Sequence, residues 1–274
     1  MKLGIIGYGR IGQMISENLL KLNLINPDEI IISNRNIKKL NKIKEDFPQI
    51  TITDNNNKEL AQSADKIIIS VESDDLLDVL REIKDDIDNT HIIHTCAGIS
   101  FDDIKEVFDG PVTVIIPSLA SRFQQRENPQ KGISLIVHND NVNFLNSTSI
   151  ETLFNEFTYV KILPSEKDIE IATILTSCAP AFISLIVKKL AEYTVENSSL
   201  DYSESKYLIL KTLIGTSENL SVDKLNNESC DAMIDSVCTP GGITEKGVEY
   251  LDTSLEEEID QLFNILFKTY NKSN

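Results

Sequence analysis

The chain has 274 residues, 41% of them hydrophobic and 25% charged, so it is long enough for one large globular domain or two modest ones. Its formal net charge of −17 argues against nucleic acids and anionic membranes as main partners. No apolar run reaches the length that we expect of a bilayer-spanning segment, and the first strand begins too close to Met1 for a signal peptide. We therefore expect a cytoplasmic protein without a membrane or nucleic-acid partner.

The first predicted element is a strand over residues 2–6, which leads directly into a glycine-rich turn. The turn reads Gly-Tyr-Gly-Arg-Ile-Gly, and the residues after it have the apolar spacing of a helix. A G-x-G-x-x-G turn between a strand and a helix is typical of dinucleotide-binding domains, because its glycines let the backbone turn tightly and approach a pyrophosphate. A glycine turn with a purely structural role is the alternative. The expected cofactor contacts are Gly7, Gly9, Arg10, Ile11 and Gly12.

The second predicted strand, over residues 30–34, indicates which dinucleotide is bound. An NAD site usually has Asp or Glu at the end of this strand to bind the ribose 2′-hydroxyl, and here the strand runs into Ser33, Asn34 and Arg35 instead. Arg35 and Ser33 are suited to a 2′-phosphate, so we expect NADP(H), with NAD(H) as the alternative. A solvated surface arginine is the other explanation of Arg35.

Further apolar runs over 66–71, 91–95, 112–116 and 132–137 alternate with charged helical stretches. Continuous apolar strands are typical of a parallel sheet that is covered on both faces. Residues 1–163 are therefore predicted to form an α/β Rossmann domain with a doubly wound parallel sheet. The polar stretch 124–131 is interpreted as an active-site flap or, equally, as a surface loop.

After Pro164 the strand pattern ends, and apolar spacing predicts helices over 165–197, 203–220, 223–237 and 254–270. Residues 164–274 are therefore predicted to form an all-helical domain. A helical region of this size buries too little apolar surface by itself. We expect it to dimerise or, alternatively, to fold back on the sheet domain.

The cysteines and histidines give no sign of a metal site. His91 and His94 lie in a predicted strand, where their side chains mostly point apart, so no metal is expected. The four cysteines lack C-x-x-C spacing, which favours reduced thiols. They are Cys96, Cys178, Cys230 and Cys238.

Two segments of the helical region have compositions that packing alone does not explain. Residues 176–182 place small side chains around Pro180, which suits the close approach of a ligand or another backbone, or simply a kinked helix. Residues 238–247 contain Pro-Gly-Gly followed by Thr244, which is well placed to begin a helix. The amides and threonine hydroxyls of this turn form a neutral cup suited to a carboxylate. A helix-capping turn without a ligand is the alternative.

Together these motifs resemble the pyrroline-5-carboxylate reductase family over essentially the whole chain. The resemblance implies an NADP-dependent enzyme that reduces 1-pyrroline-5-carboxylate to L-proline. It also implies an N-terminal Rossmann domain and helical C-terminal domains that interlock in homodimers or in higher oligomers of dimers. The matching segments are the glycine turn at 7–12, Ser-Asn-Arg at 33–35, Cys-Ala-Gly-Ile-Ser at 96–100, Ile-Pro-Ser at 116–118, Cys-Ala-Pro-Ala-Phe at 178–182 and Thr-Pro-Gly-Gly-Ile-Thr at 239–244.

The resemblance also assigns residues to the site. The substrate carboxylate is expected in the Pro-Gly-Gly-Ile-Thr turn, with Thr244 as the catalytic residue nearest the imine nitrogen. Hydride transfer to the C=N carbon needs orientation more than a strong acid, and the proton comes through Thr244 or a bound water. The nicotinamide is expected beside Val71 and Ala97, and Cys96 is a further expected cofactor contact. The expected substrate contacts are Thr239, Gly241, Gly242, Ile243, Thr244, Pro117 and Ser118.

Several motifs near the pocket depart from the family pattern. Val71-Glu72-Ser73 stands where the family has Val-Lys-Pro, and Ile-Pro-Ser-Leu-Ala at 116–120 stands where it has Met-Pro-Asn-Thr-Pro. The Ile-Pro-Ser variant resembles the divergent late-competence reductase-like branch, whereas Ala97-Gly98-Ile99 is closer to the proline-making enzymes. The alternatives are a reductase of another imine or small carboxylic acid, and a catalytically weak NADP-binding regulatory paralogue. A third is a β-hydroxyacid dehydrogenase that uses Lys188 or Lys189.

Overall fold

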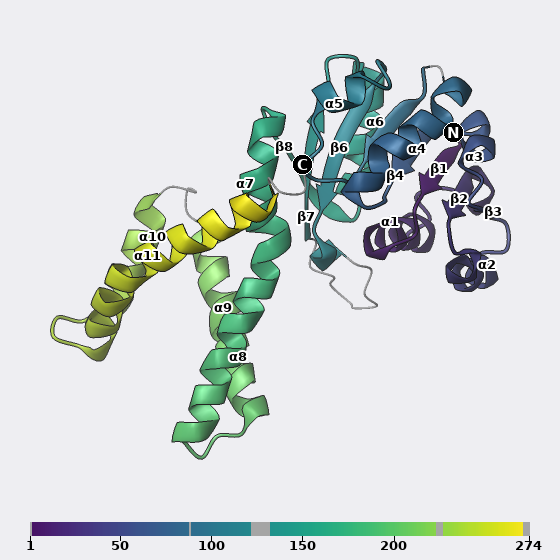
Figure 1. Ribbon diagram of the computed structural model, residues 1–274. Helices are drawn as coiled ribbons and strands as arrows, with labels where there is room; N and C mark the ends of the chain where they lie inside the picture. The colour runs from purple at the N-terminus through teal and green to yellow at the C-terminus, as the bar shows by residue number, and fades with distance from the viewer. Residues whose placement is uncertain (1, 88, 122–131, 223–226, 271–274) are drawn as a thin grey trace. The chain divides into compact units, whose positions relative to one another are not determined.

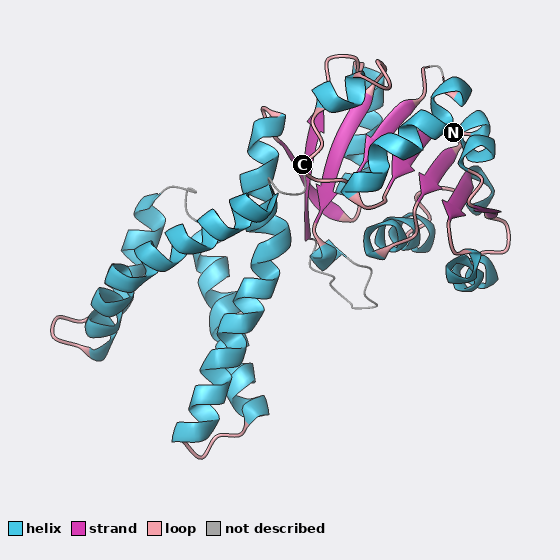
Figure 2. Ribbon diagram, viewed as in Figure 1, coloured by secondary structure: helices cyan, strands magenta, loops and turns pink. Residues whose placement is uncertain are grey.

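The computed structural model of the chain describes residues 2–87, 89–121, 132–222 and 227–270 (Figure 1). The segment 124–131, which was interpreted as a flap or a surface loop, lies outside these residues. The chain separates into two compact units, the first extending through Cys178 and the second comprising Ala179–Lys268. All the strands lie in the first unit, and the described residues of the second form helices and the turns between them (Figure 2).

The first unit is built on one eight-stranded sheet with the order β3-β2-β1-β4-β5-β6-β7-β8. Neighbouring strands from β3 to β6 are parallel, β6 and β7 are antiparallel, and β7 and β8 are parallel. The strand order reverses at β1, the kind of position where doubly wound sheets bind their ligands. The strands are β1 (Leu3–Ile6), β2 (Ile30–Asn34), β3 (Thr51–Asp54), β4 (Lys66–Ile69), β5 (His91–His94), β6 (Val112–Pro117), β7 (Gly132–His138) and β8 (Thr158–Ile162).

The two edge strands, β3 and β8, were not predicted from the sequence. Thr51 is exposed on β3, and Tyr159 on β8 is 61% exposed. Edge strands of this kind lack the continuous apolar run by which the six other strands were recognised. The antiparallel β7 also makes the sheet mostly, rather than wholly, parallel.

Helices cover both faces of the sheet. Leu3 and Ile5 of β1 pack in one cluster with α1 and α6, whereas Ile6 packs in another with α3 and α4. Alternate residues of a strand point to opposite faces, so a central strand buried in this way is apolar throughout. The helices of this unit are α1 (Arg10–Lys21), α2 (Asn41–Asp46), α3 (Asn57–Ser63), α4 (Leu76–Ile83), α5 (Phe101–Lys105), α6 (Phe144–Asn155) and α7 (Ile169–Thr173).

A row of polar side chains crosses β4, β5, β6 and β7. Lys66 Nζ lies 3.4 Å from His91 Nδ1, and His91 Nε2 lies 2.7 Å from Thr113 Oγ1. The same hydroxyl lies 2.7 Å from His138 Nδ1, and His138 Nε2 lies 3.0 Å from Glu151 Oε1 on α6. Burial, followed by the charges of Lys66 and His138, lowers the pKa of His91 to about 3. The row therefore holds His91 as a neutral imidazole.

The second unit exposes much of its apolar surface. On α8 only Val187 and Ala191 are buried, whereas Ile186 and Tyr193 are 59% and 68% exposed. Exposed apolar surface on this scale marks a site of interaction. Helices α8 and α9 lie side by side (Figure 1). The helices of this unit are α8 (Ala179–Asn197), α9 (Tyr202–Val222), α10 (Asn227–Val237) and α11 (Ile243–Tyr270).

The last helix is longer than the apolar spacing predicted. It begins at Ile243 rather than at residue 254, so the predicted start of the 254–270 helix is wrong. Gly247 and Thr253 lower helix propensity in its first turns and break the apolar pattern there. The Pro-Gly-Gly turn therefore leads straight into a helix of 28 residues.

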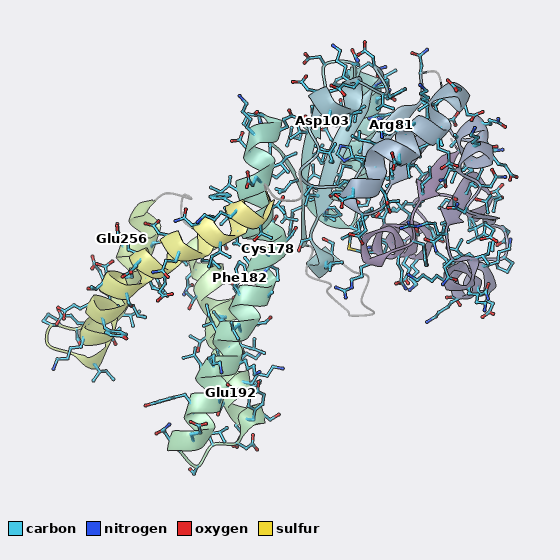
Figure 3. All side chains as sticks on the ribbon, in the orientation of Figure 1. Arg81, Asp103, Cys178, Phe182, Glu192 and Glu256 are labelled. Carbon is cyan, nitrogen blue, oxygen red and sulfur yellow. The ribbon has the colours of Figure 1, made fainter. Side chains whose placement is uncertain are left out.

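One helical segment, Glu166–Asn197, contains a π-helical turn at Ile174–Cys178. Pro180 follows this turn, and a proline cannot make the regular hydrogen bond of an α-helix. The irregular composition of 176–182 thus corresponds to a π turn in a helix that continues. Cys178, Phe182 and Glu192 follow one another along the segment (Figure 3).

The Glu166–Asn197 segment is also long and apolar enough to cross a membrane, judged by length and composition alone. Its most apolar 18-residue window has a mean hydropathy of 1.8 and is 11% buried. This finding corrects the expectation that no apolar run is long enough. Ser177, Pro180 and Ser184 interrupt the run of apolar letters, but small uncharged residues of this kind lower the hydropathy only slightly.

Candidate functional site

The glycine turn joins β1 to α1 at the carboxyl edge of the parallel strands. Gly7 has φ +94°, and its amide donates to the Ser33 carbonyl at 2.9 Å. A Cβ on Gly7 would collide with the Ser70 carbonyl, and a Cβ on Gly12 with the Gly7 carbonyl, so both positions require glycine. At Gly9 a Cβ would meet no atom within 4 Å. This open space leaves room for a phosphate to approach the turn.

A cavity of about 940 Å³ lies against this turn. Its volume is in the range of small-molecule and cofactor sites, about 300–1,000 Å³. The cavity brings together all the predicted cofactor residues except Gly12, which packs behind the turn, and Ala97. Its walls come from the glycine turn and from the segments that follow β2, β4 and β5.

The polar side chains at the end of β2 are held by other parts of the first unit. Ser33 is fully buried, and its hydroxyl donates to Asn57 Oδ1 at 2.7 Å. Asn34 Oδ1 accepts from the Tyr8 amide at 3.0 Å, and Asn34 Nδ2 donates to the Asn36 carbonyl at 2.9 Å. Asn34 thus fixes the glycine turn to the loop after β2, and Ser33 fixes β2 to the start of α3.

Arg35 reaches from the end of β2 to the segment after β4. Its guanidinium donates to Asp75 Oδ2 at 2.8 Å, and the two side chains are 72% and 38% exposed. An exposed ion pair of this kind contributes about 1 kcal/mol at most. It nevertheless places a carboxylate beside the guanidinium that was predicted to bind a 2′-phosphate.

The residues predicted beside the nicotinamide follow β4 and β5. Val71 lines the cavity, and its carbonyl accepts from the Cys96 thiol at 3.4 Å. Burial raises the pKa of Cys96 to about 12, so the thiol stays protonated and is not a nucleophile. The Ala97 carbonyl accepts from the Ser73 hydroxyl at 2.8 Å, which ties the loop after β5 to the loop after β4.

The cavity also contains residues that sequence reasoning missed. Asn36 and Lys39 line it from the segment after β2, and a group of carboxylates lines it from the segment between β4 and the end of α4. The basic pair Lys38 and Lys39 was a visible signal for an anion site, but the sequence does not say which of the two faces the cavity. Among the described residues, no group of three or more His, Cys, Asp or Glu side chains is arranged to hold a metal ion. The acidic lining residues are Glu72, Asp75, Asp78 and Glu82.

The predicted carboxylate turn lies between α10 and α11 in the second unit. The Gly242 amide donates to the Thr239 carbonyl at 2.8 Å, and Gly241 has φ +73°. Thr244 lies in the first turn of α11, directly after Ile243, which is 93% exposed. The structure thus brings the predicted substrate residues of this segment together in one tight turn at a helix N-terminus.

Within this turn the Gly241 amide already has an anionic partner. It donates to Glu245 Oε2 at 2.7 Å. Glu245 lies in the first turn of α11, where a negative charge also interacts favourably with the helix dipole. The turn therefore binds a carboxylate, and in this structure the carboxylate is that of Glu245.

Pro117 and Ser118 lie at the end of β6 in the first unit. Both are buried, and the Ser118 amide donates to the Ile133 carbonyl at 2.9 Å. Neither residue lines the 940 Å³ cavity. They belong to a different unit from the turn at 239–244.

Two family models match the chain, one near each end. Residues 2–98 match the family described as NADP oxidoreductase coenzyme F420-dependent, and residues 166–270 match pyrroline-5-carboxylate reductase dimerisation. A pyrroline-5-carboxylate reductase of Methanobrevibacter smithii is 41% identical over 253 residues, which cover 92% of this chain and 97% of the relative. The chain belongs to the pyrroline-5-carboxylate reductase family.

Two further comparisons refine this placement within the pyrroline-5-carboxylate reductase family. The structure of Plasmodium falciparum pyrroline carboxylate reductase with NADP bound shares the fold, with a TM-score of 0.83 at 23% identity over 100% of this chain and 98% of that one. ComE operon protein 4 of Bacillus subtilis, the late-competence relative, is 23% identical over 99% of this chain and 96% of its own length. The 41% identity of the M. smithii relative places the chain nearer to the pyrroline-5-carboxylate reductases than to the late-competence branch.

The dimerisation match accounts for the apolar surface of the second unit. It covers the Glu166–Asn197 segment and all four helices from α8 to α11, and a dimerisation region implies a homodimer. In a homodimer, apolar helix faces exposed in one chain have a partner surface. Lys188 and Lys189, which the alternative dehydrogenase hypothesis required, pair with Glu192 on α8 at 3.6 and 3.0 Å.

Proposed function

We propose that the protein is an NADPH-dependent pyrroline-5-carboxylate reductase that converts 1-pyrroline-5-carboxylate to L-proline. The observation that carries the proposal is the 41% identity to the M. smithii reductase over 92% of this chain. The cavity at the glycine turn and the turn at 239–244 supply the two kinds of site that the reaction needs. One suits a dinucleotide, and the other suits a small carboxylate.

The residues of the cavity fit a dinucleotide. The open space at Gly9 admits a pyrophosphate beside the first backbone amides of α1. Val71, which is proposed to flank the nicotinamide, and Cys96 both line the cavity. When bound, the reduced nicotinamide supplies the hydride that adds to the C=N carbon.

The turn at 239–244 is proposed to hold the substrate carboxylate by neutral donors. Its donors are backbone amides and the hydroxyls of Thr239 and Thr244. No cation is thereby placed beside the imine nitrogen, which must carry a proton for its carbon to accept hydride. Thr244 is proposed to hold that proton at the ring nitrogen, and fixing the ring supplies the larger part of the acceleration, on the order of 7 kcal/mol or more in well-oriented systems.

The proposal also includes what covers the apolar surface of the helical unit. We infer that the apolar faces of α8, α9 and α11 pack against a second copy of the chain and not against a membrane. The resulting homodimer is proposed to form higher oligomers. The net charge of −17 disfavours anionic membranes and nucleic acids as partners. The cysteines of the described chain are free, which supports a cytoplasmic location.

The test is an assay with the purified full chain, NADPH and 1-pyrroline-5-carboxylate, followed by the absorbance of the reduced nicotinamide. We expect rapid oxidation by the wild type and a loss of at least about 100-fold in kcat/KM for Thr244→Ala, with NADPH binding retained. Thr253→Ala, further along α11, is the matched control and is expected to keep full activity.

Tight NADPH binding without turnover of this substrate would contradict the proposal. A reductase of another imine is the second candidate, favoured by Glu72 in the cavity wall and by Glu245 at the Gly241 amide. Activity with other cyclic imines in the same assay would identify it, and inactivity with all of them would favour a regulatory paralogue.

A further inference from the structure

We infer that Arg10 and Lys39, rather than Arg35, bind the 2′-phosphate of NADPH and give the protein its preference over NADH. The inference rests on the proposed function, because it takes NADPH as the cofactor. It concerns which of this chain's own cations discriminate between the two nucleotides. Three independent features of the 940 Å³ cavity lead to it.

The first feature is that the side chains at the end of β2 already have partners. Ser33 is fully buried and donates its hydroxyl to Asn57, so that proton is not offered to a ligand. Asn34 uses its oxygen for the Tyr8 amide and its nitrogen for the Asn36 carbonyl. These side chains build the turn, and a phosphate would have to break existing hydrogen bonds to reach them.

The second feature is the distribution of charge in the cavity. The wall from the segment between β4 and the end of α4 carries four carboxylates, and Arg35 is paired with one of them, Asp75, at 2.8 Å. A 2′-phosphate carries up to two negative charges at neutral pH, so a site next to Asp75 is electrostatically unfavourable. Arg10 and Lys39, which also line the cavity, have no ion-pair or hydrogen-bond partner for their side-chain cations among the described residues. They therefore carry the positive charge that no carboxylate of the described chain pairs with.

The third feature is the position of these two cations at a junction. A second cavity of about 450 Å³ also borders the glycine turn, and it shares only Tyr8, Gly9, Arg10 and Lys39 with the first. Its other charged lining residues are Lys21, Lys42, Glu17 and Asp46. Arg10 and Lys39 therefore border both cavities next to Gly9, where the backbone leaves open space. A group at this junction lies beside the turn and between the two cations that both cavities share.

Lys39 is held in place by its neighbours in a short 3-10 helix, Ile37–Leu40. Leu40 is fully buried in the core, and Asn36 caps the helix by accepting from the Lys38 amide at 3.1 Å. The backbone of Lys39 is thus fixed between two anchored residues, while its side chain remains exposed. Lys38 is equally exposed but lines neither cavity, so it is a natural control.

The experiment measures binding directly, by calorimetry with the full-length protein, for NADPH, NADH, adenosine 2′,5′-bisphosphate and AMP. We expect Arg10→Gln and Lys39→Gln each to weaken NADPH and the bisphosphate by about 10-fold to 100-fold, the range for a charge-assisted hydrogen bond. NADH and AMP affinity stay within about twofold. Lys38→Gln leaves the affinities for all four ligands unchanged, and Arg35→Gln leaves the ratio of NADPH to NADH affinity unchanged.

Two results would overturn the inference alone. One is a selective loss of NADPH in Arg35→Gln with normal binding in the Arg10 and Lys39 variants, and the other is an equal effect of Lys38→Gln and Lys39→Gln. A wild-type protein that binds neither nucleotide would overturn the proposed function as well. Thermal melting of each variant without ligand checks that a loss of affinity does not arise from unfolding.

Discussion

The two units of the chain are stabilised in different ways. In the first, all four residues of β1 are buried and helices cover both faces of the sheet. In the second, α8 has 19 residues and buries only two of them, Val187 and Ala191. The first unit completes its core within one chain, whereas the second leaves apolar surface for another copy. The dinucleotide cavity is therefore expected to form in a monomer, and the stability of the helical unit is expected to depend on protein concentration.

The largest effect is expected from charges placed on the exposed apolar surface of the helical unit. Ile186 is 59% exposed and Ile214 is 51% exposed. We expect Ile186→Asp combined with Ile214→Asp to abolish the dimer, because each buried isoleucine contributes about 2 kcal/mol and a twofold interface loses it twice. Light scattering after size-exclusion chromatography measures the oligomer, and NADPH titration checks that the cavity persists.

The control for this prediction is Glu196→Gln, an exposed polar change on the same helix. It is expected to leave the dimer intact. A double aspartate variant that remains a dimer would show that these faces of α8 and α9 are not the interface.

The next largest effect is expected within the sheet unit. Gly7→Ala would force a Cβ toward the Ser70 carbonyl at φ +94°, and we expect a loss of about 3 kcal/mol in the free energy of unfolding. Gly9→Ala meets no atom within 4 Å, so we expect unchanged stability but weaker NADPH binding. Urea unfolding and nucleotide titration separate the two outcomes, and equal destabilisation by both changes would contradict the assignment of Gly9 to phosphate approach.

The stability of the sheet unit should also depend on pH. Burial lowers the pKa of His94 to about 4, and burial with the charges of Lys66 and His138 lowers the pKa of His91 to about 3. Below about pH 6.5 these two histidines become protonated in the unfolded chain but stay neutral in the folded one, so unfolding becomes easier as the pH falls toward 3. Above about pH 6.5 both states hold them neutral, and the free energy of unfolding no longer depends on them. Urea unfolding between pH 7.5 and 4.5 measures the slope, at most about 1.4 kcal/mol per pH unit for each histidine.

His94→Leu isolates one of these two contributions. His94 is fully buried on β5, so leucine removes the titrating ring and keeps an apolar side chain in its place. We expect a shallower slope than in the wild type. An unchanged slope would mean that His94 titrates normally in the folded protein.

The smallest effect is expected at the carboxylate turn. Removing the carboxylate charge by Glu245→Gln weakens the competitor for the Gly241 amide, which donates to Glu245 Oε2 at 2.7 Å. We expect the KM for pyrroline-5-carboxylate to fall by about threefold with kcat unchanged, in line with a net hydrogen-bond contribution of about 1 kcal/mol. Glu249→Gln, one turn further along α11, serves as the control. A higher KM in Glu245→Gln would show that this side chain supports the turn instead of competing for it.

The Rossmann fold, the helical region and the family were predicted from the sequence and are confirmed. These predictions succeeded where the signal is local: β1 is a continuous apolar run, and Gly7 and Gly12 follow it at fixed spacing. The edge strands β3 and β8 escaped prediction because exposure on one face removes that run.

The hydrogen-bond and ion-pair partners of the site residues could not be predicted from the sequence, because these partners lie on segments that are distant along the chain. Ser33 bonds to a residue 24 positions away, and Arg35 pairs with one 40 positions away. Spacing along the chain does not indicate that Arg35 meets a carboxylate or that Lys39, and not Lys38, faces the cavity. Both facts depend on how the loops after β2 and β4 pack.

The hydrogen bonds in the polar row across the sheet have a defined donor and acceptor at the Lys66 end. The ammonium of Lys66 can only donate, so His91 accepts at Nδ1 and carries its proton on Nε2. Thr113 accepts from that nitrogen, and its hydroxyl also lies 2.7 Å from His138 Nδ1, whose Nε2 faces the Glu151 carboxylate. One tautomer of His91 is thereby selected. Lys66 and Glu151 stand at the two ends of one row of polar contacts, and Thr113→Val, which removes a single hydroxyl, would interrupt the row at its centre.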